Sequence, residues 1–401
     1  MSAKAAAVSI LRAGRGWRED LINDGGGKPK PILANAITAL QSGDWAGVLA
    51  FEEHSQTIVA RKSGPWGDPK AVGDQEDRLA TEWLQRQRIL VNSATTHEAI
   101  QTVAMKNRFH RVRDWLDSLK WDGCPRIDQW LSLYLGSENS EFTQAVGARW
   151  LISAVARVYN PGCKVDCCVI LEGPQGVGKS SALREIGGKY FTDEIADLGS
   201  KDAAMQLHGA WLVEIAELDS MSRSEVGKIK AFISRQTDRY RPAYGRHVIE
   251  VPRQCVFAGS TNRESYLKDE TGGRRFWPVL CGKIDLDALR RDRDNLLAEA
   301  VHRFKEGAPW WLESPELRHL AEQQQAERYE GDPWDELIKP WLLGRSETSV
   351  SEVLQKCIDK PANNWNQSDM TRVARSLVSL GWEKRRARRS EGNVNRYFPC
   401  S

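Results

Sequence analysis

The sequence predicts an α/β core, preceded by a helical region and followed by a small basic unit. The central observation is a short apolar, β-branched run, 167–171, that leads through a glycine-rich loop into a helical pattern beginning at Ser181. Two further apolar runs, 211–218 and 255–262, indicate additional strands that end in polar residues. Helical spacing of apolar residues dominates the segments on either side of these runs.

Length and composition describe an ordinary globular chain. The 401 residues suggest two or three domains, and the hydrophobic fraction is 41%. We expect no membrane span, because no apolar run approaches about 18 residues, and no secretion signal, because the first residues lack a long apolar segment. The eight cysteines have no metal-ligand spacing and favour reduced thiols in the cytoplasm. The net charge of +3 is too small to indicate nucleic acid, so that argument depends on local clusters.

The first 160 residues divide into a weakly patterned region, 1–75, and a helical domain, 76–160. In the first region we expect a short helix over 35–40 and a small hairpin formed by 51–53 and 57–60. In the helical domain Thr96 can cap a helix. Apolar residues at helical spacing predict further helices there, through Val112, Trp115, Leu116 and Leu119, through Ile127, Trp130, Leu131 and Tyr134, and through Phe142, Val146 and Trp150.

The loop after the first core strand has the spacing of a phosphate-binding loop, Gly173-x-x-x-x-Gly178-Lys179-Ser180. Strand, glycine loop and helix follow one another as in P-loop NTPases, and the glycines allow backbone N–H groups to converge on phosphate oxygens at a helix N-terminus. We expect Lys179 to reach the β- and γ-phosphates of ATP and the Ser180 hydroxyl to bind Mg²⁺. The expected nucleotide-binding residues are Gly173, Pro174, Gln175, Gly176, Val177, Gly178, Lys179, Ser180 and Ser181.

Acidic residues lie at the end of the second core strand. A P-loop NTPase needs a carboxylate there to hold Mg²⁺, directly or through water, and a water-orienting group beside it. Glu214 and Glu217 are the candidates. Their roles stay open, because residues three apart point to opposite faces of a regular strand, which would place Glu217 just past the strand end. The alternative for one of the two is a solvated edge position.

Three more polar residues are candidates, one at the end of the third core strand and two shortly after it. Asn262 is placed to sense the γ-phosphate or to position the attacking water. Arg274 and Arg275 come after a glycine pair, and arginine suits the charge that grows on a transferring phosphoryl group. One of them could act as a finger from a neighbouring subunit. A structural pairing with Asp269 or Glu270 is the alternative for the other.

A basic stretch between the second and third core strands predicts a hairpin near a helix whose polar face carries Lys230. Cations can contact phosphates and an aromatic ring can stack on a base, so this composition suits single-stranded DNA. An ordinary solvated hairpin is the alternative. The expected DNA-binding residues here are Lys230, Arg239, Arg241, Tyr244 and Arg246.

The C-terminal third predicts helices over 285–304 and 315–328, then a small separate unit. We expect a nucleotide-binding core over 161–312, a helical connector over 313–345 and a basic unit over 346–401. In the last of these, helices over 350–358 and 368–380 and a basic hairpin are typical of a winged helix. Its candidate DNA-binding residues are Lys384, Arg385, Arg386, Arg388 and Arg389, although such a charge run is as often merely solvated.

Taken together, these residues resemble the virulence-associated protein E family, whose ATPase core is similar to superfamily-3 helicases of the AAA+ type. The resemblance extends from about Trp17 to Leu312. The residues that carry it are Trp121-Asp122-Gly123, Arg126, Asn160-Pro161-Gly162, Lys164, the stretch from Leu171 to Ser180, Glu214, Glu217-Leu218, Thr261-Asn262 and Arg274-Arg275-Phe276-Trp277.

The resemblance implies a replication ATPase of a phage, plasmid or integrated element, often paired with a separately encoded primase-polymerase. It also implies a hexameric ring with ATP between subunits, a finger arginine in trans and hairpins lining a pore. By this likeness, active-site roles carry over to Lys179, Ser180, Glu214, Glu217, Asn262 and Arg275. Many superfamily-3 members have adjacent acids in the second motif and this chain does not, so the roles of its two glutamates stay open. No primase signature is visible.

Three functional hypotheses follow. The first is an ATP-driven, Mg²⁺-dependent DNA helicase or translocase. The second is a DNA-binding replication initiator or loader that uses ATP as a switch and does not unwind DNA. The third, suggested only by the name of the family, is an interaction or effector protein.

Overall fold

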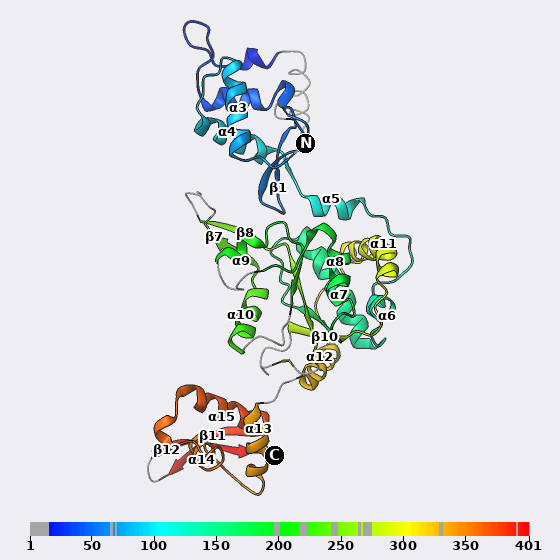
Figure 1. Cartoon of the computed structure of the whole chain (residues 1–401), viewed down its shortest axis with the longest axis vertical. Coiled ribbons are helices and arrows are strands. Elements are labelled where there is room, and N and C mark those ends of the chain that lie inside the picture. The colour runs from blue at the N-terminus through cyan, green and yellow to red at the C-terminus, as the bar shows by residue number, and fades with distance from the viewer. Residues whose placement is uncertain are drawn as a thin grey trace.

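The computed structural model describes residues 16–64, 67–68, 70–195, 201–216, 223–241, 248–263, 266–267, 275–328, 332–389 and 392–400. Along its longest axis the molecule has three parts: an N-terminal unit, a central core and a C-terminal unit (Figure 1). The core is of the α/β class and is built on a parallel sheet of five strands. None of the described helices combines the length and the apolar composition that crossing a bilayer requires.

The N-terminal unit packs helices against a small sheet. The expected hairpin is confirmed, because β1 (Leu49–Glu52) and β2 (Thr57–Ala60) pair antiparallel, with β3 (Arg108–Phe109) on the other side of β1. Around it lie η1 (Trp17–Asp20), α2 (Leu33–Leu40), η2 (Gly43–Trp45), α3 (Asp74–Arg86) and α4 (Ser93–Lys106). Their apolar faces share one core with the sheet, from Leu21 to Ala104. The expected Thr96 cap is wrong: Asn92 caps α4, and buried Thr96 donates to the Asn92 carbonyl inside the first turn.

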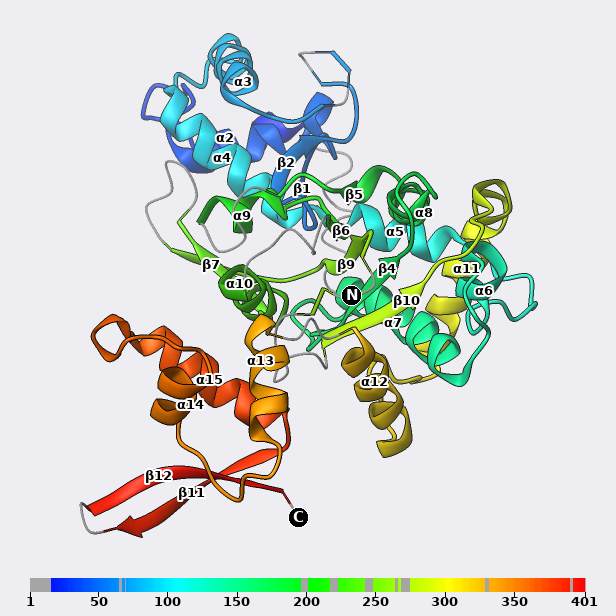
Figure 2. The same ribbon diagram turned by 60° about the horizontal axis from the view of Figure 1, so that its bottom comes forward.

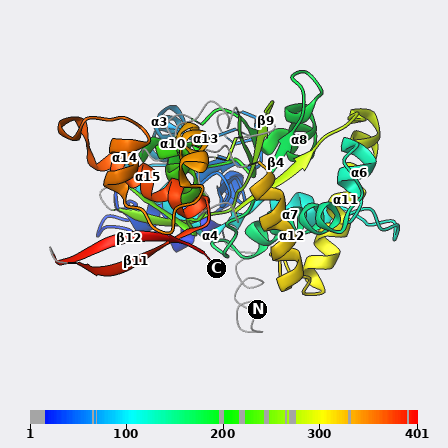
Figure 3. The same cartoon turned by 90° about the horizontal axis from the view of Figure 1, so that it is seen from below.

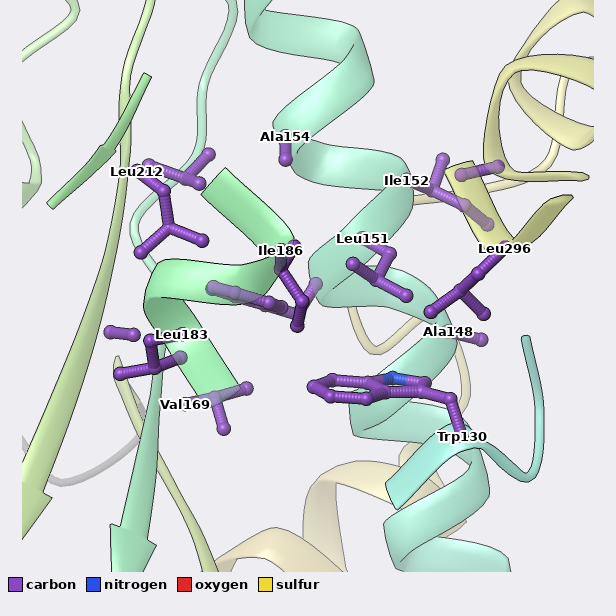
Figure 4. Close-up of a cluster of buried hydrophobic side chains, with 14 of the residues drawn as sticks. Trp130, Ala148, Leu151, Ile152, Ala154, Val169, Leu183, Ile186, Leu212 and Leu296 are labelled. Carbon is purple, nitrogen blue, oxygen red and sulfur yellow. The ribbon is translucent and has the colours of Figure 1, made fainter. Parts of the chain in front are cut away.

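Three helices of the expected helical domain belong to the central core. They are α5 (Arg111–Ser118), α6 (Trp130–Leu135) and α7 (Glu141–Tyr159), and the Ser140 hydroxyl caps α7. Most of α7 is buried, and Figure 4 shows Leu151 of α7 beside Trp130 of α6 and Ile186 of the helix after the glycine loop. The hydrophobic clusters therefore divide 76–160 between two parts of the molecule, with α3 and α4 in the N-terminal unit.

The sheet of the core has the strand order β10-β4-β9-β6-β5. The strands are β4 (Cys168–Glu172), β5 (Phe191–Thr192), β6 (Leu212–Ile215), β9 (Val256–Thr261) and β10 (Phe276–Leu280). The three expected strands are present, although β6 is shorter than the predicted 211–218. Edge strand β10 was not expected from the sequence; it contains Pro278, and proline is tolerated at sheet edges because its missing N–H is not needed there.

Helices cover both faces of the sheet. α8 (Lys179–Gly187) follows the glycine loop, η3 (Gly188–Tyr190) follows α8, and α11 (Leu286–Lys305) packs beside α7 and α8. The opposite face meets α9 (Lys201–Gln206) and α10 (Arg223–Ile233). After α11, helix α12 (Pro315–Glu327) contacts β10 and α7. Figure 3 shows α12 beside α7.

The predicted basic hairpin is formed by β7 (Thr237–Tyr240) and β8 (Ile249–Pro252), which pair antiparallel. Its tip, 242–247, lies outside the described residues. The base of the hairpin is fixed by Arg253, whose guanidinium is buried against the Asp238 carboxylate.

The C-terminal unit has a core of its own, which runs from Ile338 to Tyr397. Helices α13 (Pro333–Leu342), α14 (Val350–Lys356) and α15 (Gln367–Ser379), with the short turn η6 (Ala362–Asn364), pack against the hairpin of β11 (Trp382–Arg389) and β12 (Gly392–Pro399) (Figure 2). Of the expected connector, α13 joins this unit, whereas α12 packs on the central core.

The N-terminal unit meets the core through histidines. His54 Nε2 lies 3.1 Å from the Ala210 carbonyl, and the His110 ring contacts Gln254. Both rings are buried, with centroids 5.4 Å apart. Burial, and to a smaller extent the neighbouring His110, lower the pKa of His54 to about 4.

Candidate functional site

The glycine loop, residues 173–178, leaves the carboxyl end of β4 and enters α8. Gly173, Gly176 and Gly178 have φ angles of +141°, +82° and +103°, which residues with a Cβ rarely adopt. Gly178 is the N-cap of α8, so the loop curls over the amino end of that helix. This is the arrangement in which backbone N–H groups and the helix dipole favour an anion.

Lys179 lies in the first turn of α8 and is largely buried. Its Nζ donates to the carbonyls of Gly173 (2.6 Å) and Pro174 (2.9 Å) and to Oδ1 of Asn262 (3.0 Å). The ammonium group therefore sits inside the curve of the glycine loop. Asn262 reaches this group because β9 lies beside β4 and runs parallel to it, so the carboxyl ends of the two strands are neighbours.

Ser180, in the first turn of α8, and Glu214, in β6, also meet near the carboxyl ends of the strands. The Ser180 hydroxyl donates to Glu214 Oε1 at 2.7 Å, and the Ser260 hydroxyl donates to the same oxygen at 2.6 Å. Glu214 is only 2% exposed, and its other oxygen, Oε2, is buried without a hydrogen-bond partner among the described residues. A buried carboxylate oxygen without a partner is expected to accept a hydrogen bond or to bind a cation. Sequence reasoning did not identify Ser260.

Arg275 lies at the amino ends of the sheet strands, whereas the glycine loop lies at their carboxyl ends. It precedes Phe276, which pairs with Cys168 at the start of β4, so six strand positions, about 20 Å, separate it from Gly173. Its Nε donates to the Ser234 hydroxyl at 2.7 Å. The structure therefore joins Lys179, Ser180, Glu214 and Asn262 and keeps Arg275 apart from them.

One buried pair at the glycine loop was not found from the sequence. Glu172, the last residue of β4, accepts from Arg328 Nε at 2.8 and 3.1 Å. Arg328 follows α12, 156 residues along the chain. An acidic residue at the end of an apolar strand, directly before Gly173, was the only signal available in the sequence.

The expected DNA-binding residues have different surroundings. Lys230 is buried, with Nζ over the Phe276 ring, so the expectation of an exposed Lys230 is wrong: α10 turns that side chain into the core. Arg239 and Arg241 are exposed on the hairpin. Also exposed are Lys384, Arg385 and Arg386 of β11. Glu217, Tyr244, Arg246 and Arg274 lie outside the described residues, and the structure describes only the backbone of Arg388 and Arg389.

Comparison with known proteins gave a family match. The model of the virulence-associated protein E-like domain matches residues 116–330. Among solved structures, the apo structure of the NrS-1 C-terminal region aligns with a TM-score of 0.47 and 11% identity over 88% of this chain and 96% of that one. An A-form apo structure of the same region gives 0.44 and 12% over the same shares. No curated protein matched.

Proposed function

Because the chain belongs to the virulence-associated protein E-like family, we propose that it is an ATP-driven, Mg²⁺-dependent DNA helicase or translocase. Its role would be the replication of a phage, plasmid or integrated mobile element. The observation that carries the proposal is the convergence of Lys179, Ser180, Glu214 and Asn262 around the glycine loop. This is the polar set that a P-loop NTPase of the AAA+ type uses to bind and hydrolyse a nucleoside triphosphate.

The residues present fit Mg²⁺. The ion prefers oxygen ligands, keeps several waters and is usually bound by one or two protein groups plus phosphates. Ser180 Oγ and the Glu214 carboxylate supply such oxygens, and Glu214 Oε2 is buried without a hydrogen-bond donor from the part of the chain that the structure describes. These two residues would hold the ion. When bound, Mg²⁺ neutralises charge on the β- and γ-phosphates.

The remaining roles are assigned to side chains of this chain. When nucleotide binds, Lys179 would donate to phosphate oxygens in place of the carbonyls of the glycine loop. Its charge would then stabilise the charge that develops on the γ-phosphate. Asn262, which already touches Lys179, contacts the γ-phosphate or the attacking water. Since Glu214 is engaged with Ser180, we assign the orientation of the water to Glu217. Arg275 acts from the neighbouring subunit, because in its own chain it lies at the amino ends of the strands, away from the glycine loop.

DNA would meet the exposed cations. We assign single-strand contacts to Arg239, Arg241 and the hairpin tip that carries Tyr244 and Arg246, and backbone contacts to the basic run of β11. A hexameric ring would place these hairpins around a central strand. A separately encoded primase-polymerase is the partner we expect.

Lys179→Ala tests the site directly. The substitution removes the phosphate-binding cation, so ATP turnover should fall by roughly a hundredfold or more. The matched control is Lys106→Ala, which changes an exposed lysine at the end of α4 in the N-terminal unit. Wild-type turnover in the Lys179→Ala protein would refute the assignment.

Strand displacement on forked DNA then separates a helicase from the alternative. ATP-dependent release of the displaced strand by wild type, lost in Lys179→Ala, supports unwinding. ATP-dependent DNA binding without release of the strand would instead identify a replication initiator or loader.

A further inference from the structure

A pocket lies at the opposite end of β4 from the glycine loop. It has a volume of about 430 Å³ and is formed where residues 164–167 enter β4, against β10, α12 and the segment after α11. The five residues of β4 place it roughly 16 Å from the glycine loop. We call it the tryptophan pocket; its lining includes Lys164, Asp166, Trp277, Trp310, Trp311, Arg318 and Glu322.

Three tryptophans line this pocket. Trp311 is 52% exposed, and among the described residues it is the one aromatic side chain in the set of exposed large hydrophobic residues. Trp310 holds it edge to face at a centroid distance of 5.2 Å and is itself fixed by an Nε1–H bond to the Lys164 carbonyl. The wall includes Trp277, whose buried Nε1 has no hydrogen-bond partner among the described residues. An exposed indole on a rigid support is a stacking surface.

The charges of the tryptophan pocket balance. Lys164 and Arg318 are opposed by Asp166 and Glu322, so the lining does not favour a free anion. A neutral, planar group with N–H donors matches a lining that combines carboxylates with aromatic rings. Arg318 is exposed beside the rings, where a cation can contact a phosphate attached to such a group. A nucleobase joined to a phosphate backbone combines these features.

We propose that the tryptophan pocket holds one base of single-stranded DNA, stacked on Trp311, while Arg318 contacts the adjoining phosphate. This inference rests on the proposed function, because it takes DNA as the ligand. It adds a contact on the face of the core away from the nucleotide site, in addition to the hairpin and the C-terminal unit. An apolar side chain of a protein partner is the competing occupant, and the test below distinguishes the two.

Photocrosslinking with the full-length, nucleotide-free protein tests the location. A single-stranded oligothymidine that carries 5-iodouracil should crosslink to the tryptic peptide 306–318, which contains Trp310 and Trp311. The same peptide should be unlabelled in a Trp311→Ala protein. Crosslinks that map only to other peptides would overturn the proposal.

Affinity measurements over a range of salt concentrations test the two contacts separately. Trp311→Ala should weaken binding of the oligonucleotide roughly tenfold at every salt concentration, because stacking is lost. Arg318→Ala should instead reduce the slope of log affinity against log salt by about 1, because one phosphate contact is lost. Trp311→Phe should recover part of the affinity. Leu133→Ala, which removes an exposed apolar side chain on α6, is the control.

The outcomes distinguish this proposal from the proposed function. Wild-type DNA affinity in Trp311→Ala, with DNA still bound by the wild-type protein, would assign the pocket to a protein partner and overturn the inference alone. Absence of DNA binding by the wild-type protein would overturn the proposed function together with the inference. Thermal melting checks that each variant is folded, and because Trp311 is half exposed we expect no loss of stability.

Discussion

Glu214 shows how a single buried atom can define a site. One of its oxygens accepts from two serines, while the other is buried without a donor among the described residues. Isolated desolvation of a carboxylate is unfavourable, so the arrangement is best explained by an additional cation or water. The spacing of Glu214 and Glu217 could not separate their roles, because a one-dimensional pattern does not reveal that Ser180 and Ser260 converge on one oxygen of Glu214.

Glu214→Gln tests this at the residue scale. The amide keeps the size of the side chain but loses the negative charge, so the Mg²⁺ concentration required for half-maximal ATP turnover should rise roughly tenfold or more. Titration of Mg²⁺ at saturating ATP measures the change. Glu82→Gln, an exposed change on α3, should leave the titration unaltered. An unaltered Mg²⁺ requirement in Glu214→Gln would remove Glu214 from the metal site.

His54 predicts a pH dependence of stability. Burial, with smaller contributions from His110 and His208, lowers its folded-state pKa to about 4, although Glu52 acts in the opposite direction. An unfolded histidine titrates near 6.5. The stabilising contribution is therefore fully present above about pH 6.5 and is lost as pH falls towards 4, by at most about 3 kcal/mol. Urea unfolding between pH 7.5 and 5 should show this loss. His54→Gln should flatten the dependence, and His319→Gln, an exposed control, should not.

At the scale of elements, the amphipathic helices were the most predictable features. The helical spacing through Phe142, Val146 and Trp150 lies within α7, and the expected helix over 285–304 corresponds to α11 almost residue for residue. Edge strand β10 was missed, because a proline in a short apolar run argues against a strand, and only the position at the sheet margin makes it acceptable. Lys230 was expected on the exposed face of its helix, because helical spacing alone does not show that its side chain packs on Phe276.

The Glu172–Arg328 pair links β4 to the end of α12, and both side chains are largely buried. Arg328→Met would leave a buried carboxylate without its partner, so the free energy of unfolding should fall by about 3 kcal/mol or more. Adding Glu172→Gln should recover part of this loss. Urea unfolding measures all three proteins. Arg86→Met, which breaks an exposed pair with Glu82 on α3, should change stability by less than about 1 kcal/mol.

At the scale of the whole molecule, the C-terminal unit has its own hydrophobic core, and residues 329–331 connect it to α12. Removing 332–401 should therefore leave the central core folded and capable of basal ATP turnover. DNA affinity should decrease, because the cations of β11 are lost. Filter binding and ATPase assays on the truncated protein measure both effects. Loss of folding after truncation would show that the unit is required by the core.

The position of Arg275 predicts an effect that only mixed assemblies can show. Arg275→Ala and Lys179→Ala subunits should each be inactive alone. Mixed oligomers should regain part of the ATP turnover, because some interfaces then combine an intact Lys179 with an intact Arg275 from the neighbour. Mass spectrometry verifies that the subunits have mixed. No recovery in verified mixtures would contradict a finger in trans.

The two margins of the central sheet have a consequence for assembly. One margin is β10, which is interrupted by Pro278, and the other is β5, which is only two residues long. A proline-containing edge and a very short edge are poor templates for the backbone pairing that would join sheets of separate copies. Crowded chains are thereby protected from fibrillar aggregation at this sheet, so we expect copies that associate through the central core to do so by side-chain surfaces and not by backbone pairing.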